Sequence, residues 1–169
     1  MPAIVLVTPQ IPPNTGNIAR TCAATTTPLH LVGPLGFDLS DRALKRAGLD
    51  YWPQVDLTLH TDWDAFSTQQ RQQGGRTIGF STSGRCSYTE LTYRTDDWLL
   101  FGSETEGLPK TVLATCDETA YIPMDRAVVR SLNLSVSAAI ALYETLRQLH
   151  LFHPRSTPGI ADNKDPAQL

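Results

Sequence analysis

Short apolar runs recur along this chain, and stretches with helical character separate them. Residues 3–7 (AIVLV), 77–80 (TIGF) and 98–101 (WLLF) are almost wholly apolar, as expected for strands buried on both faces. Further strands are expected at residues 29–32, 55–59 and 120–123. Because the strands alternate with helices, the sequence predicts an α/β fold: a mostly parallel sheet flanked by helices.

Helices are expected between these strands, over residues 15–24, 39–47, 62–73, 110–114 and 133–150. Asn14, Asp62 and Asn133 stand where N-caps belong, since their side chains can accept hydrogen bonds from the first free N–H groups. Residues 1–152 are long enough for a single domain with its own core. The polar, proline-containing tail 153–169 is expected to be disordered.

Composition excludes several classes of protein. The net charge of −3 gives the whole chain no attraction to nucleic acid, so any such site must be a local basic patch. The three cysteines are isolated and have no ligand spacing with the four histidines, so no metal site is expected. Isolated thiols favour a cytoplasmic setting, and no apolar run approaches membrane-spanning length.

The stretch FGSETEGLPKT, residues 101–111, follows a predicted buried strand and has the character of a ligand-binding turn. Gly102 and Gly107 have P-loop separation, but Lys110 and Thr111 come two positions too late. Two carboxylates in the loop would also repel a polyphosphate. A cationic or hydroxyl-rich ligand suits the loop better, and a plain strand–turn–helix corner is the alternative.

Two polar clusters are further candidates for a site. In the first helix Asn17 and Arg20 lie on a face away from Ile18, which makes an anion-facing role an alternative to plain solvation. Arg130, Ser131 and neighbouring polar residues gather at the start of the last helix, where backbone donors are free for a ligand. Capping by one asparagine would explain only part of that cluster.

A basic patch precedes the third predicted strand. Arg42, Lys45 and Arg46 fall on one helical face, next to the aromatic residues Tyr51 and Trp52. Basic side chains beside aromatic rings are typical of a small RNA-binding surface. A solvated helix face is an equally good interpretation.

The last helix carries more apolar surface than one core-facing stripe needs. Val136 and Tyr143 belong to one apolar stripe, and Leu142 and Leu146 belong to another. Either the helix is fully buried, or it packs on its own sheet and also on a second subunit.

Together, several stretches resemble the SPOUT RNA 2′-O-methyltransferases, and within them the branch that methylates the wobble nucleotide of tRNA. The stretches are IPPNTGNIARTCAAT (11–25), KRAGLDYW (45–52), FGSETEGLP (101–109), and IPM with RSLNLSVSAAIALYETLRQ (122–148). They occur in family order, and the match runs from residue 3 to about residue 152. One departure is Ser103, which stands where the family often has proline.

The resemblance implies a C-terminal deep trefoil knot, S-adenosylmethionine bound in that knot, and a homodimer formed through the C-terminal helix. It implies tRNA as the partner. The cofactor-binding residues it implies are Phe80, Ser81, Thr82, Gly102, Glu104, Gly107, Ile122, Met124, Ser131 and Leu132. We expect the carboxylate of Glu104 to help the site electrostatically, because the sulfonium is cationic.

The reaction implied is an in-line displacement by a ribose 2′-hydroxyl at the methyl carbon, with Arg20, Ser131 and Asn133 as the catalytic residues. Arg20 is either the base or a clamp on the neighbouring phosphate, and a guanidinium that stays protonated suits the clamp better. Asn17 and the basic patch are the expected RNA contacts. The competing hypotheses are a non-catalytic RNA-binding module, methylation of another RNA such as rRNA, and a small-molecule α/β enzyme, for which the sequence has only broken motifs.

Overall fold

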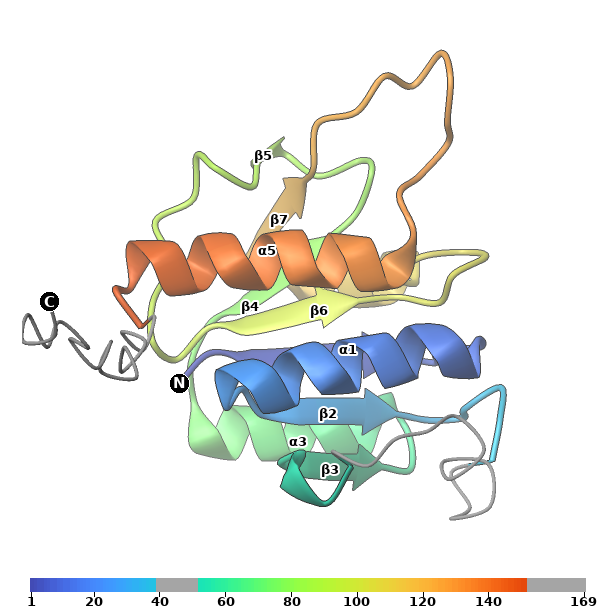
Figure 1. Ribbon diagram of the computed structural model, residues 1–169, viewed down its shortest axis with the longest axis vertical. Coiled ribbons are helices and arrows are strands. Elements are labelled where there is room, and N and C mark those ends of the chain that lie inside the picture. The colour runs from blue at the N-terminus through green and yellow to red at the C-terminus, as the bar shows by residue number, and fades with distance from the viewer. Residues whose placement is uncertain (39–51, 152–169) are drawn as a thin grey trace, which may run out of the picture.

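A computed structural model describes residues 1–38 and 52–151. Its centre is a sheet in the order β3-β2-β1-β6-β4-β7-β5, and every strand pairing in it is parallel (Figure 1). The predicted α/β class is therefore confirmed. The strands are β1 (Ala3–Val7), β2 (Leu29–Val32), β3 (Leu57–His60), β4 (Thr77–Phe80), β5 (Cys86–Ser87), β6 (Trp98–Phe101) and β7 (Glu118–Tyr121).

Helices cover both faces of the sheet. The helix α1 (Pro12–Thr25) and the helix α5 (Leu134–Gln148) lie side by side on one face (Figure 1). The helices α3 (Trp63–Gln73) and α4 (Lys110–Thr115) pack on the other face, and a short 3₁₀ helix, η1 (Trp52–Gln54), precedes β3.

The central strands supply apolar side chains to both layers. In β1, Ile4 and Leu6 face the core under α1 and α5, whereas Val5 and Val7 face the core under α3 and α4. All four side chains are almost fully buried. Burial of one such side chain contributes about 1.5–3 kcal/mol, so a strand without polar alternation is stable only between two helical layers.

The predicted start of the first helix was wrong. The helix begins at Pro12, with the N-cap at Ile11, rather than after an Asn14 cap. Proline lacks an N–H, and the first helical positions need none, so Pro12 and Pro13 begin the helix instead of delaying it. This places Asn14 inside the first turn, with its side chain buried.

Other boundaries were partly right. The caps Asp62 and Asn133 are confirmed, since they accept hydrogen bonds from the N–H groups of Ala65 and Ser135 at 2.9 and 2.8 Å. The strand expected at 55–59 begins two residues later, because the N–H of Val55 closes a turn onto Trp52. The strand expected at 120–123 spans Glu118–Tyr121 instead, and β5 was not predicted.

The last helix is not fully buried within one chain. Ala141 and Leu142 are buried, but Val136 and Tyr143 remain 46% and 47% exposed. None of the described helices is long and apolar enough to cross a membrane. The knot and the single-domain boundary at residue 152 stay predictions. The helix expected over 39–47 and the tail 153–169 lie outside the described residues.

Candidate functional site

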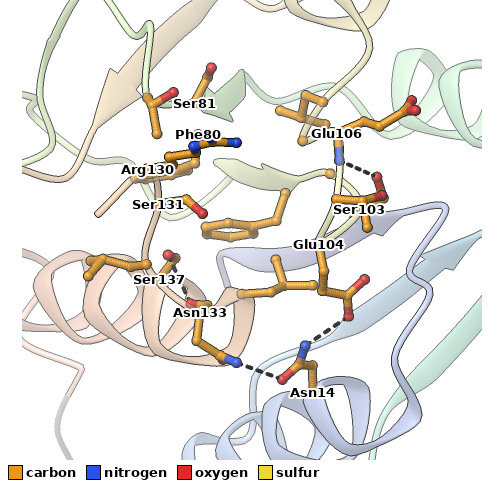
Figure 2. Close-up of a pocket in the computed structure, with 18 of the residues that line it drawn as sticks. Asn14, Phe80, Ser81, Ser103, Glu104, Glu106, Arg130, Ser131, Asn133 and Ser137 are labelled. Carbon is orange, nitrogen blue, oxygen red and sulfur yellow. Dashed lines mark hydrogen bonds between the residues drawn. The ribbon is translucent and has the colours of Figure 1, made fainter. Parts of the chain in front are cut away.

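A cavity of about 520 Å³ opens at the carboxyl ends of three neighbouring strands. Phe80 ends β4, Phe101 ends β6, and Ile122 follows β7; the starts of α1 and α5 close the remaining side (Figure 2). Ligands of parallel α/β proteins bind at such strand ends. The structure brings every expected cofactor-binding residue to this cavity: Phe80, Ser81, Thr82, Gly102, Glu104, Gly107, Ile122, Met124, Ser131 and Leu132.

Aromatic rings form part of the cavity wall. Phe80 and Phe101 stack with ring centroids 4.8 Å apart and an interplanar angle of 14°. They belong to β4 and β6, which are neighbours in the sheet, so the stack is held by the strands themselves. The cavity therefore combines a rigid apolar wall with loops of polar groups, which is usual for a small-molecule site.

The loop after β6 is closed tightly on itself. Ser103 forms an antiparallel bridge with Gly107, and the N–H of Gly107 donates to the carbonyl oxygen of Ser103 at 2.9 Å. The Oγ of Ser103 accepts a hydrogen bond from the N–H of Glu106 at 3.2 Å (Figure 2). Ser103, the departure from the family pattern, thus supports the loop through its hydroxyl.

The carboxylate of Glu104 is held by donors from α1 and the residues just before it. It accepts hydrogen bonds from the N–H groups of Gln10 and Ile11 at 2.8 and 3.2 Å, and from the side-chain amide of Asn14 at 3.0 Å. A carboxylate beside the first N–H groups of a helix is favourable. The electrostatic role expected for Glu104 did not include these hydrogen bonds to the start of α1.

Asn14 also reaches the start of α5. The Nδ2 of Asn133 donates to the Oδ1 of Asn14 at 3.0 Å (Figure 2). Asn14 was missed as a site residue, because the two prolines before it were interpreted as a break and Asn14 as a cap. Pro12 and Pro13 are compatible with the first helical positions, and a helix that begins there would have placed the Asn14 side chain on the inner face.

The segment between β7 and α5 forms the rim of the cavity. Met124, Arg130 and Ser131 line it, and the guanidinium of Arg126 donates to the carbonyl oxygen of Thr82. Arg130 and Ser131 are themselves solvent-exposed. A cation and a hydroxyl at an open rim suit a ligand that carries negative charge.

Not every expected residue reaches the cavity. Asn133 lines it, but Arg20 and Asn17 are exposed positions of α1 and do not. Trp52 packs, half-buried, against the core under α1 and α5. The other expected RNA contacts, Arg42, Lys45, Arg46 and Tyr51, lie outside the described residues.

The thiols of Cys22, which is buried, and Cys116, which is half-buried, are poor candidates for chemistry. Burial raises the pKa of the Cys22 thiol to about 12. Burial, and secondarily the charge of Asp117, raises the pKa of Cys116 to about 11. Both thiols stay protonated at neutral pH and are poor nucleophiles. In the described part of the chain, no three His, Cys, Asp or Glu side chains gather in a way that could hold a metal ion.

The sequence profile of the SpoU rRNA Methylase family matches residues 1–143. The chain belongs to this family. It is 60% identical over 149 residues to a Synechocystis sp. protein with the provisional name tRNA (cytidine(34)-2′-O)-methyltransferase, covering 88% of this chain and 97% of that one. The identification confirms the resemblance to SPOUT 2′-O-methyltransferases.

Solved structures agree with membership of the SpoU family. A structure described as giving insights into the 2-OH methylation of C/U34 on tRNA superposes with a TM-score of 0.83 at 52% identity, covering 89% of this chain and 97% of that chain. The SpoU methyltransferase AviRb from Streptomyces viridochromogenes, in complex with the cofactor AdoMet, superposes with a TM-score of 0.76 at 25% identity. That match covers 89% of this chain and 58% of AviRb.

Proposed function

We propose that this SpoU-family protein transfers a methyl group from S-adenosylmethionine to the ribose 2′-hydroxyl of the wobble nucleotide, C or U at position 34, of tRNA. The observation that carries the proposal is the convergence of three family motifs on one cavity. FGSETEGLP, IPM and the RSLN segment are far apart in sequence and line the same space. The 60% identical relative and the C/U34 structure support the choice of substrate.

The residues present fit S-adenosylmethionine. The volume of about 520 Å³ lies within the range of small-ligand sites, roughly 300–1,000 Å³. The stacked Phe80 and Phe101 offer an apolar wall for adenine, and the loops at Ser81, Gly102 and Ile122 offer backbone donors and acceptors. When bound, this cofactor supplies a methyl group on a positively charged sulfur.

The polar residues at the rim would handle the RNA. Ser131 and Arg130 are exposed at the cavity mouth, where a ribose and its phosphate would arrive. A guanidinium stays protonated at neutral pH, so Arg20 acts in this proposal as a clamp on phosphate rather than as a base. Asn133 and Ser131 complete the proposed catalytic set. Contact of RNA with Asn17, Trp52 and the patch over 42–51 stays a prediction.

We also propose that the protein is a homodimer that acts in the cytoplasm. Val136 and Tyr143 lie two turns apart on the open side of α5, and Ile11 at the start of α1 is 42% exposed. Exposed large apolar side chains on neighbouring helices are typical of a subunit interface. The substrate tRNA and the three free cysteines favour a reducing compartment.

Methyl transfer to defined RNAs tests the proposed function. The protein would be incubated with methyl-labelled S-adenosylmethionine and an unmodified tRNA transcript. A matched transcript with a 2′-deoxynucleotide at position 34 lacks only the proposed acceptor. We expect label in the first RNA and none in the second. Equal labelling of both transcripts would refute nucleotide 34 as the methylated position. Transfer to rRNA alone would favour an rRNA substrate.

A lack of transfer would have two meanings, which calorimetry with S-adenosylmethionine separates. Binding without transfer to tRNA or rRNA would point to a missing substrate or accessory factor. Absence of binding would favour the non-catalytic RNA-binding module.

A further inference from the structure

A row of three side chains joins the cavity loop to both neighbouring helices. Glu104, on the loop after β6, accepts a hydrogen bond from the Nδ2 of Asn14 on α1 at 3.0 Å. The Oδ1 of Asn14 accepts one from the Nδ2 of Asn133 at 3.0 Å. The Oδ1 of Asn133 accepts the N–H and the hydroxyl of Ser135 at 2.8 and 2.7 Å. We refer to Glu104, Asn14 and Asn133 as the polar row (Figure 2).

The direction of every hydrogen bond in the polar row is determined by the contact between Asn133 and Ser135 at the start of α5. The N–H of Ser135 can only donate, so it requires the oxygen of the Asn133 amide. The nitrogen of that amide then faces Asn14 and requires an oxygen there. The nitrogen of Asn14 is left to face residue 104. The orientation of both amides is thus determined by their partners, independently of how nitrogen and oxygen are assigned.

Residue 104 must therefore accept a hydrogen bond from each of its three partners. It faces the Asn14 nitrogen and the N–H groups of Gln10 and Ile11, which are all donors. A carboxylate has only acceptors, whereas a glutamine would turn an NH₂ group toward at least one donor. The need for glutamate at this position arises from hydrogen-bond direction, and no proton transfer is required to explain it.

Glu104 also holds the N-cap residue of α1. Ile11, the N-cap, has no polar side chain, Pro12 and Pro13 have no N–H, and the N–H of Asn14 already donates to the carbonyl oxygen of Ile11. Glu104, 93 residues away in sequence, accepts the N–H of Ile11 itself from the cavity loop. The start of α1 is thereby joined to the loop, and α1 also carries Arg20.

We infer that Glu104 is a positioning residue: its carboxylate orients α1, and with it Arg20, relative to the cavity through the polar row. The inference rests on the proposed function for its effect on methyl transfer. Its structural part concerns the protein alone. A direct catalytic role for the charge of Glu104 is the alternative that the test must separate.

The test exchanges the carboxylate and the amide between two positions. Glu104→Gln turns an NH₂ group toward a donor, either the N–H of Gln10 or the amide of Asn14, and Asn14→Asp places two carboxylates against each other. In the double variant, the new amide at position 104 can donate to the new carboxylate at position 14, and that carboxylate can still accept from Asn133. The double variant keeps the total charge of the row, and an acid in the first turn of a helix is favourable.

We expect each single variant to lower the kcat of methyl transfer about tenfold or more, because each sets like groups against each other within a partly buried row. The double variant should recover part of both losses, in kcat and in the unfolding midpoint, because its amide at position 104 donates to the new carboxylate but still turns the same NH₂ group toward the N–H of Ile11. Asp96→Asn, the same type of change at an exposed position, serves as the control and should leave both values unchanged.

Two results would overturn the inference. If the double variant recovered its unfolding midpoint but stayed as slow as Glu104→Gln, the charge at position 104 would act in the chemistry itself. If the double variant lost as much stability as the two single variants together, the side chains of the polar row would not be coupled. The unfolding midpoints can be measured even if the wild-type protein transfers no methyl group, so failure of the proposed function is distinguishable from failure of this inference.

Discussion

The backbones of Gly102 and Gly107 are in direct contact. A Cβ atom on Gly102 would lie 1.9 Å from the carbonyl carbon of Gly107 and 2.0 Å from the nitrogen of Leu108. Since neither neighbour is the movable end of a side chain, any residue larger than glycine must displace the loop. Gly107 itself has a φ of +72°, a conformation that glycine adopts without strain. The two glycines therefore determine the shape of the cavity wall.

Gly102→Ala should abolish high-affinity cofactor binding. The added methyl group forces the loop over 103–107 away from β6 and shifts the cavity wall. We expect the Kd for S-adenosylmethionine, measured by calorimetry, to rise at least about tenfold, since even a modest misfit costs about 1–3 kcal/mol. Circular dichroism should show a folded protein. An unchanged Kd would mean that this loop is not part of the cofactor site.

Much of the fold could be predicted because it depends on burial. The apolar runs gave the correct bounds of β1, β2, β4 and β6, since a strand between two helical layers needs no polar position. By contrast, β5 (Cys86–Ser87) has two residues and no hydrophobic pattern, so nothing local distinguishes it from a loop. Its pairing with β7 depends on tertiary structure.

The residues of the cavity could not be predicted from the hydrophobic pattern alone. Gly102, Ile122 and Ser131 were grouped by resemblance to a family, because periodicity does not tell which strand ends are neighbours. Asn14 was missed because its partners, Glu104 and Asn133, lie 90 and 119 residues away in sequence. Hydrogen-bond direction within such a row is decided by the assembled fold and leaves no local signal.

Arg20→Ala should separate transfer from cofactor binding. Because Arg20 does not line the cavity, the Kd for S-adenosylmethionine should stay within about twofold of wild type, whereas loss of a charged contact to phosphate lowers kcat/KM by at least about tenfold. Arg20→Lys keeps the charge but loses the planar fork, so partial activity is expected.

The pH dependence distinguishes the two roles of Arg20. If it is a clamp, the dependence of kcat/KM on pH between about 6 and 9 should have the same shape in wild type and in Arg20→Lys. A rate that rises with pH in the wild type, with a displaced profile in the lysine variant, would instead indicate a base.

Tyr143→Glu should disrupt the proposed homodimer. Tyr143 is 47% exposed on α5, and a carboxylate buried in a subunit interface without a partner is strongly unfavourable. Sedimentation should show a dimer for wild type and a monomer for the variant. Leu59→Glu, at a 57% exposed position of β3, is the matched control and should stay dimeric. A monomeric wild-type protein would contradict the proposal.

Acid should destabilise the protein through two buried histidines. The Nδ1 of His30 and the Nε2 of His60 lie 2.9 Å apart on neighbouring strands. Burial, and secondarily the charge of His60, lowers the pKa of His30 from 6.5 to about 4. Burial lowers the pKa of His60 as well. The pair is therefore held neutral in the folded protein.

The sign of the effect follows from proton binding. Below a pH of about 6.5 the unfolded chain takes up protons on these histidines that the folded chain does not. The free energy of unfolding should be highest above about pH 6.5 and fall toward about pH 4, by up to about 1.4 kcal/mol per pH unit for each such proton. Urea unfolding should show a flatter dependence in His60→Asn and no change in His150→Asn, which alters an exposed histidine. Equal slopes in all three proteins would refute this origin.

The most direct test of the proposed function is the position of the methyl group. A tRNA transcript treated with the protein and S-adenosylmethionine would be digested with alkali and the fragments identified by mass spectrometry. A methylated 2′-hydroxyl cannot attack the adjacent phosphate, so the bond after that nucleotide survives. We predict one alkali-resistant bond, following nucleotide 34, with a mass increase of one methyl group. Complete cleavage after nucleotide 34, or resistance at another position, would contradict the proposal.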